Sequence, residues 1–316
     1  MNAALQWGLD FVRLAQGQAN PALVFFMRGV SALGSVAALA GLVALVYWCV
    51  DERKGLRLGA LMLLSAWLNI VLKLLLDQPR PFDLDPALGL VGASLGGLPS
   101  GHAQNTLVML FALASFGKAK TRTFFIPALA LCLLVGFSRV FLGAHFPTDV
   151  LGGWLVGAVL LCAYFVFGDR VEALLDEHAP RAGLIAAAAL SFVMILHRPS
   201  ALVLAPAGAL LGMGVGFHLS RKYASFVARM PIGRREPVAF LILLARFALG
   251  AAGAVFLFVF SENIIDALRG PANLNYELFV FARFALVALW ISAGAPLLFR
   301  ALRLVDSNVI HYQEHD

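Results

Sequence analysis

Three short clusters of polar residues stand out in this otherwise apolar chain, and their side chains are of the types that handle phosphate. The clusters are Lys73 with Arg80-Pro81, then Pro99-Ser100-Gly101-His102, then Ser138-Arg139 followed by His145 and Asp149. Ammonium and guanidinium groups bind phosphoryl oxygens, and a histidine paired with a carboxylate is suited to act as a nucleophile. Together the clusters predict a site that cradles a phosphoryl group and attacks it.

The chemistry expected of the second and third clusters depends on local geometry. A helix that begins at Gly101-His102 offers free backbone N–H groups and the positive end of its dipole to an anion. His102 beside that anion can donate a proton near neutral pH. Asp149 comes four residues after His145, so its carboxylate can hold one ring nitrogen and leave the other free to attack.

Each cluster also has a simpler explanation when it is taken alone. The Lys73 ammonium can extend from a helix end to the membrane surface. Ser100 can be an ordinary helix cap, and Asp149 can cap the helix that begins after Pro147, which would leave His145 as a loop histidine. The presence of all three clusters in one chain favours the phosphate site.

Composition indicates the setting of this site. The chain has 316 residues, of which 61% are hydrophobic and 13% charged, and its mean hydropathy is +0.85. These values are typical of an all-α, polytopic membrane protein, and about nine apolar segments are near the length of a spanning helix. They cover residues 29–50, 56–76, 102–117, 124–143, 148–168, 183–197, 201–219, 237–260 and 276–299. Cys49, Cys132 and Cys162 fall inside them, so we expect packing roles rather than a disulfide framework or a metal cluster.

Charged residues outside these segments predict the orientation. Basic residues gather in alternate connections, which we expect to be cytoplasmic: Arg53, Lys54, Arg57, Lys118, Lys120, Arg122, Arg170, Arg181, Arg221, Lys222, Arg229, Arg234, Arg235, Arg300 and Arg303. Both loops with the phosphate-site residues then lie on the opposite, external or periplasmic face of the cell (inner) membrane. The net charge of +6 is explained by this topology, so we expect no nucleic-acid partner.

The three clusters resemble the three signature motifs of the type 2 phosphatidic acid phosphatase (PAP2) family, without a departure at any motif position. The resemblance implies a six-helix catalytic core within residues 21–182, with its sixth helix reaching about residue 200. Residues 1–20 are expected to form an interfacial amphipathic helix, and residues 201–316 additional spans and a cytoplasmic tail.

The resemblance also implies roles for the motif residues. His145 would attack phosphorus to form a phosphohistidine, Asp149 would orient it, and His102 would protonate the leaving oxygen and then activate water. The phosphoryl oxygens would be bound by Lys73, Arg80, Ser100, Gly101 and Arg139. The family needs no metal or other cofactor. Asp77, Asp83 and Asp85 are too few and too close to loop solvent to hold magnesium.

The substrate and the last helices leave alternatives open. The first candidate substrate is a lipid phosphate, presented from the surrounding membrane lipids. A soluble sugar phosphate is the second, because the chain is similar in span number to the glucose-6-phosphatases, and phosphoryl transfer to another acceptor is a third. A lipid or solute translocator that retains a phosphate-binding mouth is a different class, in which Arg246 and Arg283 would line a path. Those two arginines can equally extend to the membrane surface.

Overall fold

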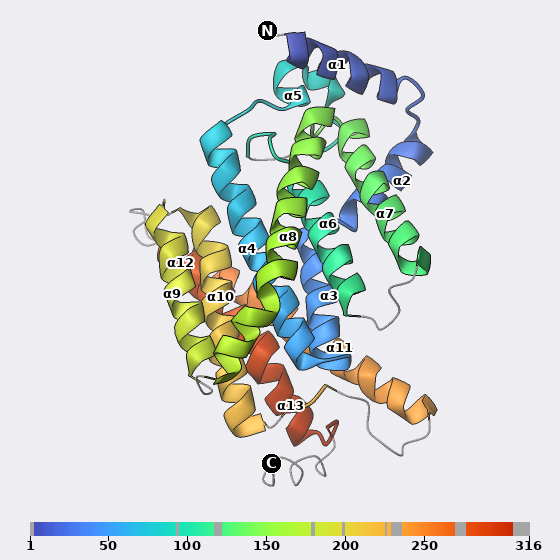
Figure 1. Cartoon of the computed structure of the whole chain (residues 1–316). Coiled ribbons are helices and arrows are strands. Elements are labelled where there is room, and N and C mark those ends of the chain that lie inside the picture. The colour runs from blue at the N-terminus through green and yellow to red at the C-terminus, as the bar shows by residue number, and fades with distance from the viewer. Residues whose placement is uncertain are drawn as a thin grey trace. The chain divides into compact units, whose positions relative to one another are not determined.

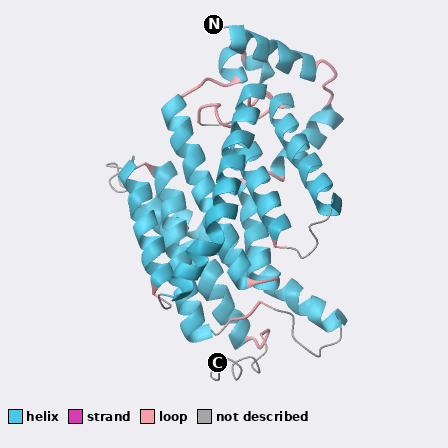
Figure 2. Cartoon of the chain, viewed as in Figure 1, coloured by secondary structure: helices cyan, strands magenta, loops and turns pink. Residues whose placement is uncertain are grey.

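The computed structural model describes residues 3–92, 95–116, 122–177, 181–197, 200–224, 226–228, 236–268 and 276–305. Within these ranges every regular element is a helix or a helical turn (Figure 2). The all-α class expected from the composition is therefore confirmed. Several basic loop residues used for the orientation, among them Lys118, Lys120, Arg229, Arg234 and Arg235, lie outside the described residues, as does the tail after residue 305.

The chain forms two compact units. The first contains Met1–Ala40 and Leu64–Gly168, and the second contains Gly41–Leu63 and Asp169–Asp316. Helices α3 (Val36–Cys49), α4 (Glu52–Leu76) and α8 (Pro147–Glu177) contribute residues to both units, so no single cut in the chain separates them. The expected division into a catalytic core and C-terminal spans stays a prediction.

The first unit carries all the phosphate-site residues. Besides its parts of α3, α4 and α8, it contains α1 (Ala3–Gln16), α2 (Pro21–Ala32), α5 (Pro81–Leu84), η1 (Pro86–Leu88), α6 (Gly101–Ser115) and α7 (Arg122–Phe141) (Figure 1). Local sequence explains several ends. The Asn20 side chain accepts the N–H of Leu23 at 3.0 Å, and Pro21 follows at the first helical position. Pro147 likewise begins α8.

Helix α1 is buried on one side against the segment that holds the phosphate-site histidine. Leu9 and Val12 pack with Phe146, the residue after His145. On other sides of α1, Trp7 is 53% exposed and Leu14 79% exposed. The helix therefore has apolar side chains on two sides, one buried in the protein and one exposed. A position in the membrane interface remains a prediction.

The second unit contains the remaining helices. They are α9 (Ala182–His197), α10 (Ala201–Leu219), η2 (Ser220–Ala224), α11 (Glu236–Leu268), α12 (Tyr276–Leu289), η3 (Trp290–Gly294) and α13 (Ala295–Ala301). Gly208 and Gly212 of α10 lie directly against the backbone of Phe281 and Ala285 in α12, where a Cβ atom would have no room. Glycines four residues apart thus let two helices approach closely, as in other membrane bundles.

Six helices of the described chain are long and apolar enough to cross a membrane, and the bent pair α2–α3 makes a seventh if its two helices form one span. The angle between α2 and α3 is 45°. The expectation of about nine spans is therefore too high. The two segments that fall short are α6, with 15 residues, and α9, with 16. Helix α6 also carries Gln104, Asn105 and Thr106 in its interior, which lowers its hydropathy.

Candidate active site

The end of helix α7 brings His145 back toward Arg139. Gly143 has a φ of +68°, and its N–H bonds to the carbonyl of Val140 at 2.9 Å. The N–H of Ala144 bonds to the carbonyl of Arg139 at 3.1 Å, which completes a Schellman motif. A residue with a Cβ atom is strained at this φ, so glycine permits the reversal. The His145 N–H also bonds to the Arg139 carbonyl, at 3.2 Å.

The imidazole of His145 lies between a carboxylate and a guanidinium. Its Nδ1 is 3.3 Å from Asp149 Oδ2, and its Nε2 is 3.3 Å from Arg80 Nη1. A guanidinium can only donate hydrogen bonds, so Nε2 must present its lone pair to Arg80 and the ring proton belongs on Nδ1, facing Asp149. This assigned tautomer is the one that a nucleophilic Nε2 requires. Asp149, at the third residue of α8, also accepts the N–H of Phe146 at 2.9 Å, so it is a helix cap as well.

Burial and nearby cations favour the neutral form of both site histidines. Burial, together with the charges of Arg80, Lys73 and Arg139, holds the pKa of His145 well below its ordinary value. Burial and the same three cations, Arg139 first among them, lower the pKa of His102 to about 3. His102 also acts on the His145 pKa, so the two rings share one electrostatic environment. His102 makes no hydrogen bond with the described residues.

The three cations predicted to bind phosphate are buried around this pair. Arg80 donates from Nε to the Leu95 carbonyl at 2.5 Å and from Nη1 to the Ala144 carbonyl at 2.8 Å. Arg139 donates from Nη1 to the Ser31 hydroxyl at 2.6 Å, and its buried Nε has no partner among the residues that the structure describes. Free donors on a buried guanidinium indicate room for an anion.

The side chain of Lys73 is held inside the protein. Its ammonium is buried and donates to the carbonyls of Gly96 at 2.5 Å and Gly97 at 2.9 Å. The segment with Gly96 and Gly97 therefore forms part of the wall of the site. These bonds favour a role of Lys73 inside the protein over the simpler explanation by snorkelling.

The turn that contains Ser100 and Gly101 offers further donors at the start of α6. The Ser100 hydroxyl makes no capping bond and is buried without a partner, so it is not an ordinary helix cap. A Cβ atom on Gly101 would lie 2.9 Å from Asn69 Oδ1. The glycine is therefore needed because α4 approaches this turn closely.

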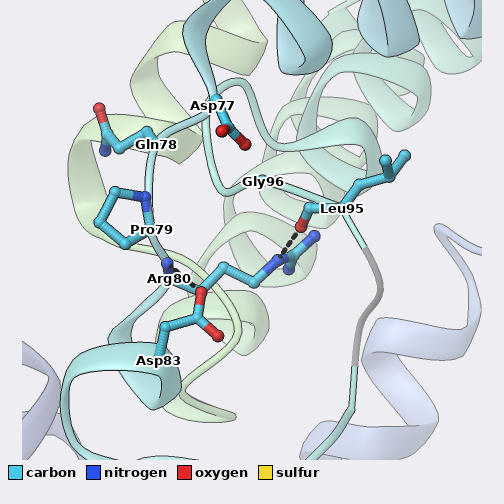
Figure 3. Close-up of a pocket in the computed structure, with 7 residues that line it drawn as sticks. All are labelled: Asp77, Gln78, Pro79, Arg80, Asp83, Leu95 and Gly96. Carbon is cyan, nitrogen blue, oxygen red and sulfur yellow. Dashed lines mark hydrogen bonds between the residues drawn. The ribbon is translucent and has the colours of Figure 1, made fainter.

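A pocket of about 250 Å³ adjoins the site on one side of Arg80 (Figure 3). Its lining consists of Asp77, Gln78, Pro79, Arg80, Asp83, Leu95 and Gly96. Asp83 accepts the backbone N–H of Arg80 at 2.8 Å and so fixes the turn that carries this arginine. The pocket therefore opens beside one of the cations expected to hold phosphate.

A buried polar network behind the site was missed in the sequence. Asn69 donates to the Pro99 carbonyl at 3.2 Å and to Gln104 Oε1 at 2.8 Å, and Gln104 donates to the Ser65 carbonyl and hydroxyl, each at 2.9 Å. The signal that could have revealed it is the spacing of Ser65, Asn69 and Lys73, four residues apart on one face of α4. This network anchors the turn before Ser100.

Comparison with known proteins agrees with the motifs. Residues 54–172 match the PAP2 superfamily, and residues 204–307 match the transmembrane extension of PAP2 superfamily phosphatases. The second match covers helices for which the motifs gave no explanation. Arg246 and Arg283, which would line the path in the translocator alternative, both lie within this second match.

Phosphatases of known activity are similar to large parts of the chain. Phosphatidylglycerophosphatase B of Bacillus subtilis (strain 168) is 33% identical over 165 residues, 48% of this chain and 79% of that protein. Glucose-6-phosphatase 3 of Homo sapiens is 27% identical over 316 residues, 83% of this chain and 85% of that protein. A crystal structure of a transmembrane PAP2-type phosphatidylglycerolphosphate phosphatase from Bacillus subtilis is 30% identical, covers 54% of this chain and 89% of that one, and has a TM-score of 0.47.

The first of these relatives is 33% identical to this chain over an alignment that covers 79% of its own length. We conclude that the chain belongs to the PAP2 superfamily, as a multi-span membrane protein and a phosphoric ester hydrolase.

Proposed function

We propose that this protein hydrolyses the phosphate monoester or diphosphate of a lipid through a phosphohistidine intermediate, without a metal, at the external face of the cell (inner) membrane. The observation that carries the mechanism is the placement of His145, with Nδ1 toward Asp149 and Nε2 toward a guanidinium. Such a ring has its lone pair aimed at the place where the cations would hold an anion.

The first half of the reaction forms the phosphoenzyme. When a phosphoryl group enters, the Arg80 guanidinium moves from Nε2 of His145 to the phosphoryl oxygens. The freed lone pair of His145 attacks phosphorus in line, the P–N bond forms, and the bond from phosphorus to the leaving oxygen breaks. His102 gives its proton to that oxygen, and Asp149 stabilises the positive charge that develops on His145.

The second half releases phosphate. His102, now neutral, takes a proton from water, the water oxygen attacks phosphorus, and the P–N bond breaks to return His145 to its starting form. In both halves negative charge spreads over the equatorial oxygens, where Lys73, Arg80, Arg139, Ser100 and the Gly101 amide would hold it. Loss of one such donor typically lowers kcat by about 10²–10³.

His102 needs a proton before it can act as the acid, although the cations keep it neutral in the empty site. A phosphate dianion offsets those cations and so favours protonated His102. Substrate binding would therefore charge the acid that the next step uses. We propose that proton uptake accompanies binding.

A lipid substrate is supported by exposed apolar side chains on the helices that carry or adjoin the site residues, among them Leu75, Leu84 and Leu151, and by the named activity of the bacterial relative. Residues 1–20 would then lie as an interfacial helix beside the core of residues 21–182, and 201–316 would add spans and a cytoplasmic tail. The external face is supported by the basic residues in the connections of the opposite side. Helix α6 begins at the site and runs toward the connection that contains Lys118 and Lys120.

A soluble sugar phosphate is the second candidate substrate. The match to glucose-6-phosphatase 3 of Homo sapiens extends over 83% of this chain, well beyond the motif region. The length of this match favours a shared architecture through the C-terminal helices.

The test of the mechanism is phosphate release by the detergent-solubilised protein, compared with His145→Ala. We expect release by the parent and a loss of about a thousandfold or more in the variant. A denaturing quench during turnover is expected to trap a phosphoenzyme that is labile in acid and stable in alkali, as a phosphoramidate is. Unchanged turnover in the variant would refute the mechanism.

A substrate panel separates the two candidates. It contains phosphatidic acid, phosphatidylglycerophosphate, an isoprenyl diphosphate, a sphingoid phosphate and glucose 6-phosphate. The lipid proposal expects the highest kcat/KM with one of the lipids, and preference for the sugar phosphate would favour the second candidate. Assays with a chelator and with added magnesium test the metal-free site, which strict magnesium dependence would contradict.

A further inference from the structure

The carboxylate of Asp149 is completely buried, and both of its oxygens are held. Oδ2 accepts the Phe146 N–H at 2.9 Å and faces His145 Nδ1 at 3.3 Å. Oδ1 accepts the side-chain amide of Gln78 at 2.9 Å. Among the described residues, Gln78 is thus the side chain that satisfies the oxygen turned away from the histidine.

Gln78 comes from a different motif segment than Asp149. It lies between Lys73 and Arg80, in the turn that leaves α4, where Asp77 has a φ of +39°. The side-chain bond to Asp149 therefore joins the cation-bearing turn to the first turn of α8. A change in either turn would move the orienting carboxylate.

The backbone of Gln78 is fixed as well. Its carbonyl accepts the N–H of Gly97 at 2.6 Å. A Cβ atom on Gly97 would lie 2.8 Å from Asp149 Oδ2, so this glycine rests against the same carboxylate. The Gln78 amide also points away from the Arg80 guanidinium in the pocket lining (Figure 3). Its donors are therefore directed to Asp149 and not to the cation.

A buried carboxylate with an unsatisfied oxygen rotates, attracts water or takes a proton. Any of these outcomes weakens the bond from Oδ2 to His145 Nδ1, on which the tautomer of the nucleophile depends. An amide suits this position because it donates a hydrogen bond without adding charge. A carboxylate there would only accept, and it would repel Asp149.

We propose that Gln78 is a positioning residue that orients Asp149 and, through it, His145 for attack on phosphorus. The inference rests on the proposed phosphohistidine mechanism and adds Gln78 to the pair formed by Asp149 and His145. Gln78 acts through Asp149 and touches neither the phosphoryl group nor the leaving oxygen.

The test compares Gln78→Glu and Gln78→Ala with the parent, in kcat, KM and phosphoenzyme formation across pH. We expect kcat to fall about 10-fold in Gln78→Ala and about 100-fold in Gln78→Glu, with KM little changed. The acid limb of the kcat profile should move to higher pH in both, because a carboxylate with one donor fewer takes up a proton more readily. A role in folding alone would not move this limb.

Gln6→Glu is the matched control. The Gln6 amide also faces an aspartate, with its Nε2 3.3 Å from Asp10 Oδ1, but on the exposed surface of α1. We expect this variant to retain parental kcat and pH profile. Thermal unfolding of each variant reports on the fold separately.

The outcomes distinguish the inference from the mechanism beneath it. If His145→Ala is inactive while Gln78→Glu keeps the parental kcat and pH profile, the positioning role is wrong and the mechanism survives. If a Gln78 variant loses only folded protein and its remaining activity has the parental pH profile, the role is structural and the inference is likewise wrong. If His145→Ala retains activity, both fail.

Discussion

Two buried arginines, one in each unit, make opposite use of their guanidinium groups. Arg246 in the second unit is 0% exposed, and it donates from Nε and Nη2 to the Leu304 carbonyl and from Nη1 to the carbonyls of Trp48 and Ala228. Arg139 in the first unit bonds the Ser31 hydroxyl through Nη1, while its buried Nε has no partner.

The difference teaches how to interpret a charge buried in a membrane protein. Burial is costly for either arginine, so burial alone does not indicate function. Arg246 holds three chain segments together through backbone carbonyls, whereas Arg139 keeps a donor unused beside two histidines. Between these two arginines, the difference lies in the unfilled donor of Arg139 and not in charge or depth.

Arg283 falls between these cases. It pairs with Glu262 at 2.8 Å and lies over the Phe258 ring at 3.7 Å, although its Nε has no hydrogen-bond partner. Because Glu262 is half-exposed, its ion pair with Arg283 fits a position close to the protein surface better than a position along a transport path. Neither arginine of the second unit therefore supports the translocator alternative.

Removal of Arg246 should have the largest effect, and it should fall on stability. Arg246→Ala leaves buried carbonyls without a donor, which we expect to lower the free energy of unfolding by about 3–5 kcal/mol. The molecules that fold should keep the parental kcat/KM. Denaturant unfolding in detergent, with activity per folded molecule, checks both; a selective loss of kcat would erase the contrast with Arg139.

Arg139→Ala should show the reverse pattern. We expect kcat/KM to fall by about 10²–10³, because the variant lacks a preformed donor for the charge of the transition state. The thermal midpoint should change little, since one hydroxyl bond is lost. Arg139→Lys should recover only part of the activity, because an ammonium keeps the charge but lacks the planar fork. Full activity in Arg139→Ala would show that an unfilled donor is no guide to the site.

Gly101→Ala should have a smaller effect that depends on α4. The new Cβ atom would meet Asn69 Oδ1 at 2.9 Å and displace the turn, at a cost of about 1–3 kcal/mol in transition-state stabilisation. Asn69→Ala removes the opposing oxygen, although it also removes the bond to Pro99. A double-mutant cycle should therefore give a loss smaller than the sum of the single variants. Additive losses would show that Gly101 is not energetically coupled to Asn69.

The smallest effect concerns protons. Because burial and cations lower the pKa of His102 to about 3, the empty site holds this ring neutral at neutral pH. A bound oxyanion raises that pKa, so binding takes up a proton, is strongest at low pH, and weakens as pH rises through the His102 pKa of the complex. Tungstate, a dianion near neutral pH, serves as the probe.

Calorimetry of tungstate binding in buffers of different protonation enthalpy measures this uptake, with His102→Gln as the control. We expect less than one proton per site for the parent and a much smaller value for the variant. Equal uptake in both proteins would assign the proton to another group. The satisfied guanidinium of Arg246 offers no comparable site for an anion.

Much of the site could be predicted because its residues are costly in an apolar chain. Lys73, Arg80, Arg139 and the two histidines stand out in composition alone, and their order and spacing matched a family. Gln78, Asn69 and Gln104 could not be assigned in the same way, because a neutral amide in a helix or a turn has many ordinary uses. Their partners lie 30 to 71 residues away in the chain.

The number of spans was overestimated for a related reason. Apolar content shows that a segment is buried or in lipid, but α6 has 15 residues and carries polar residues near its start, of which Gln104 accepts a hydrogen bond from Asn69 of α4. Hydropathy does not distinguish a helix that supports a site from one that crosses the membrane.

The sequence by itself determined the helical class and the membrane setting and predicted the residue types of the candidate site, because each follows from local composition, periodicity and short motifs. Only the tertiary structure decided which donors are filled. It placed the Lys73 ammonium on the Gly96 and Gly97 carbonyls, left the Ser100 hydroxyl free, and set Gln78 on Asp149. Hydrogen bonds between distant segments depend on how helices and turns pack, and local sequence does not encode that packing residue by residue.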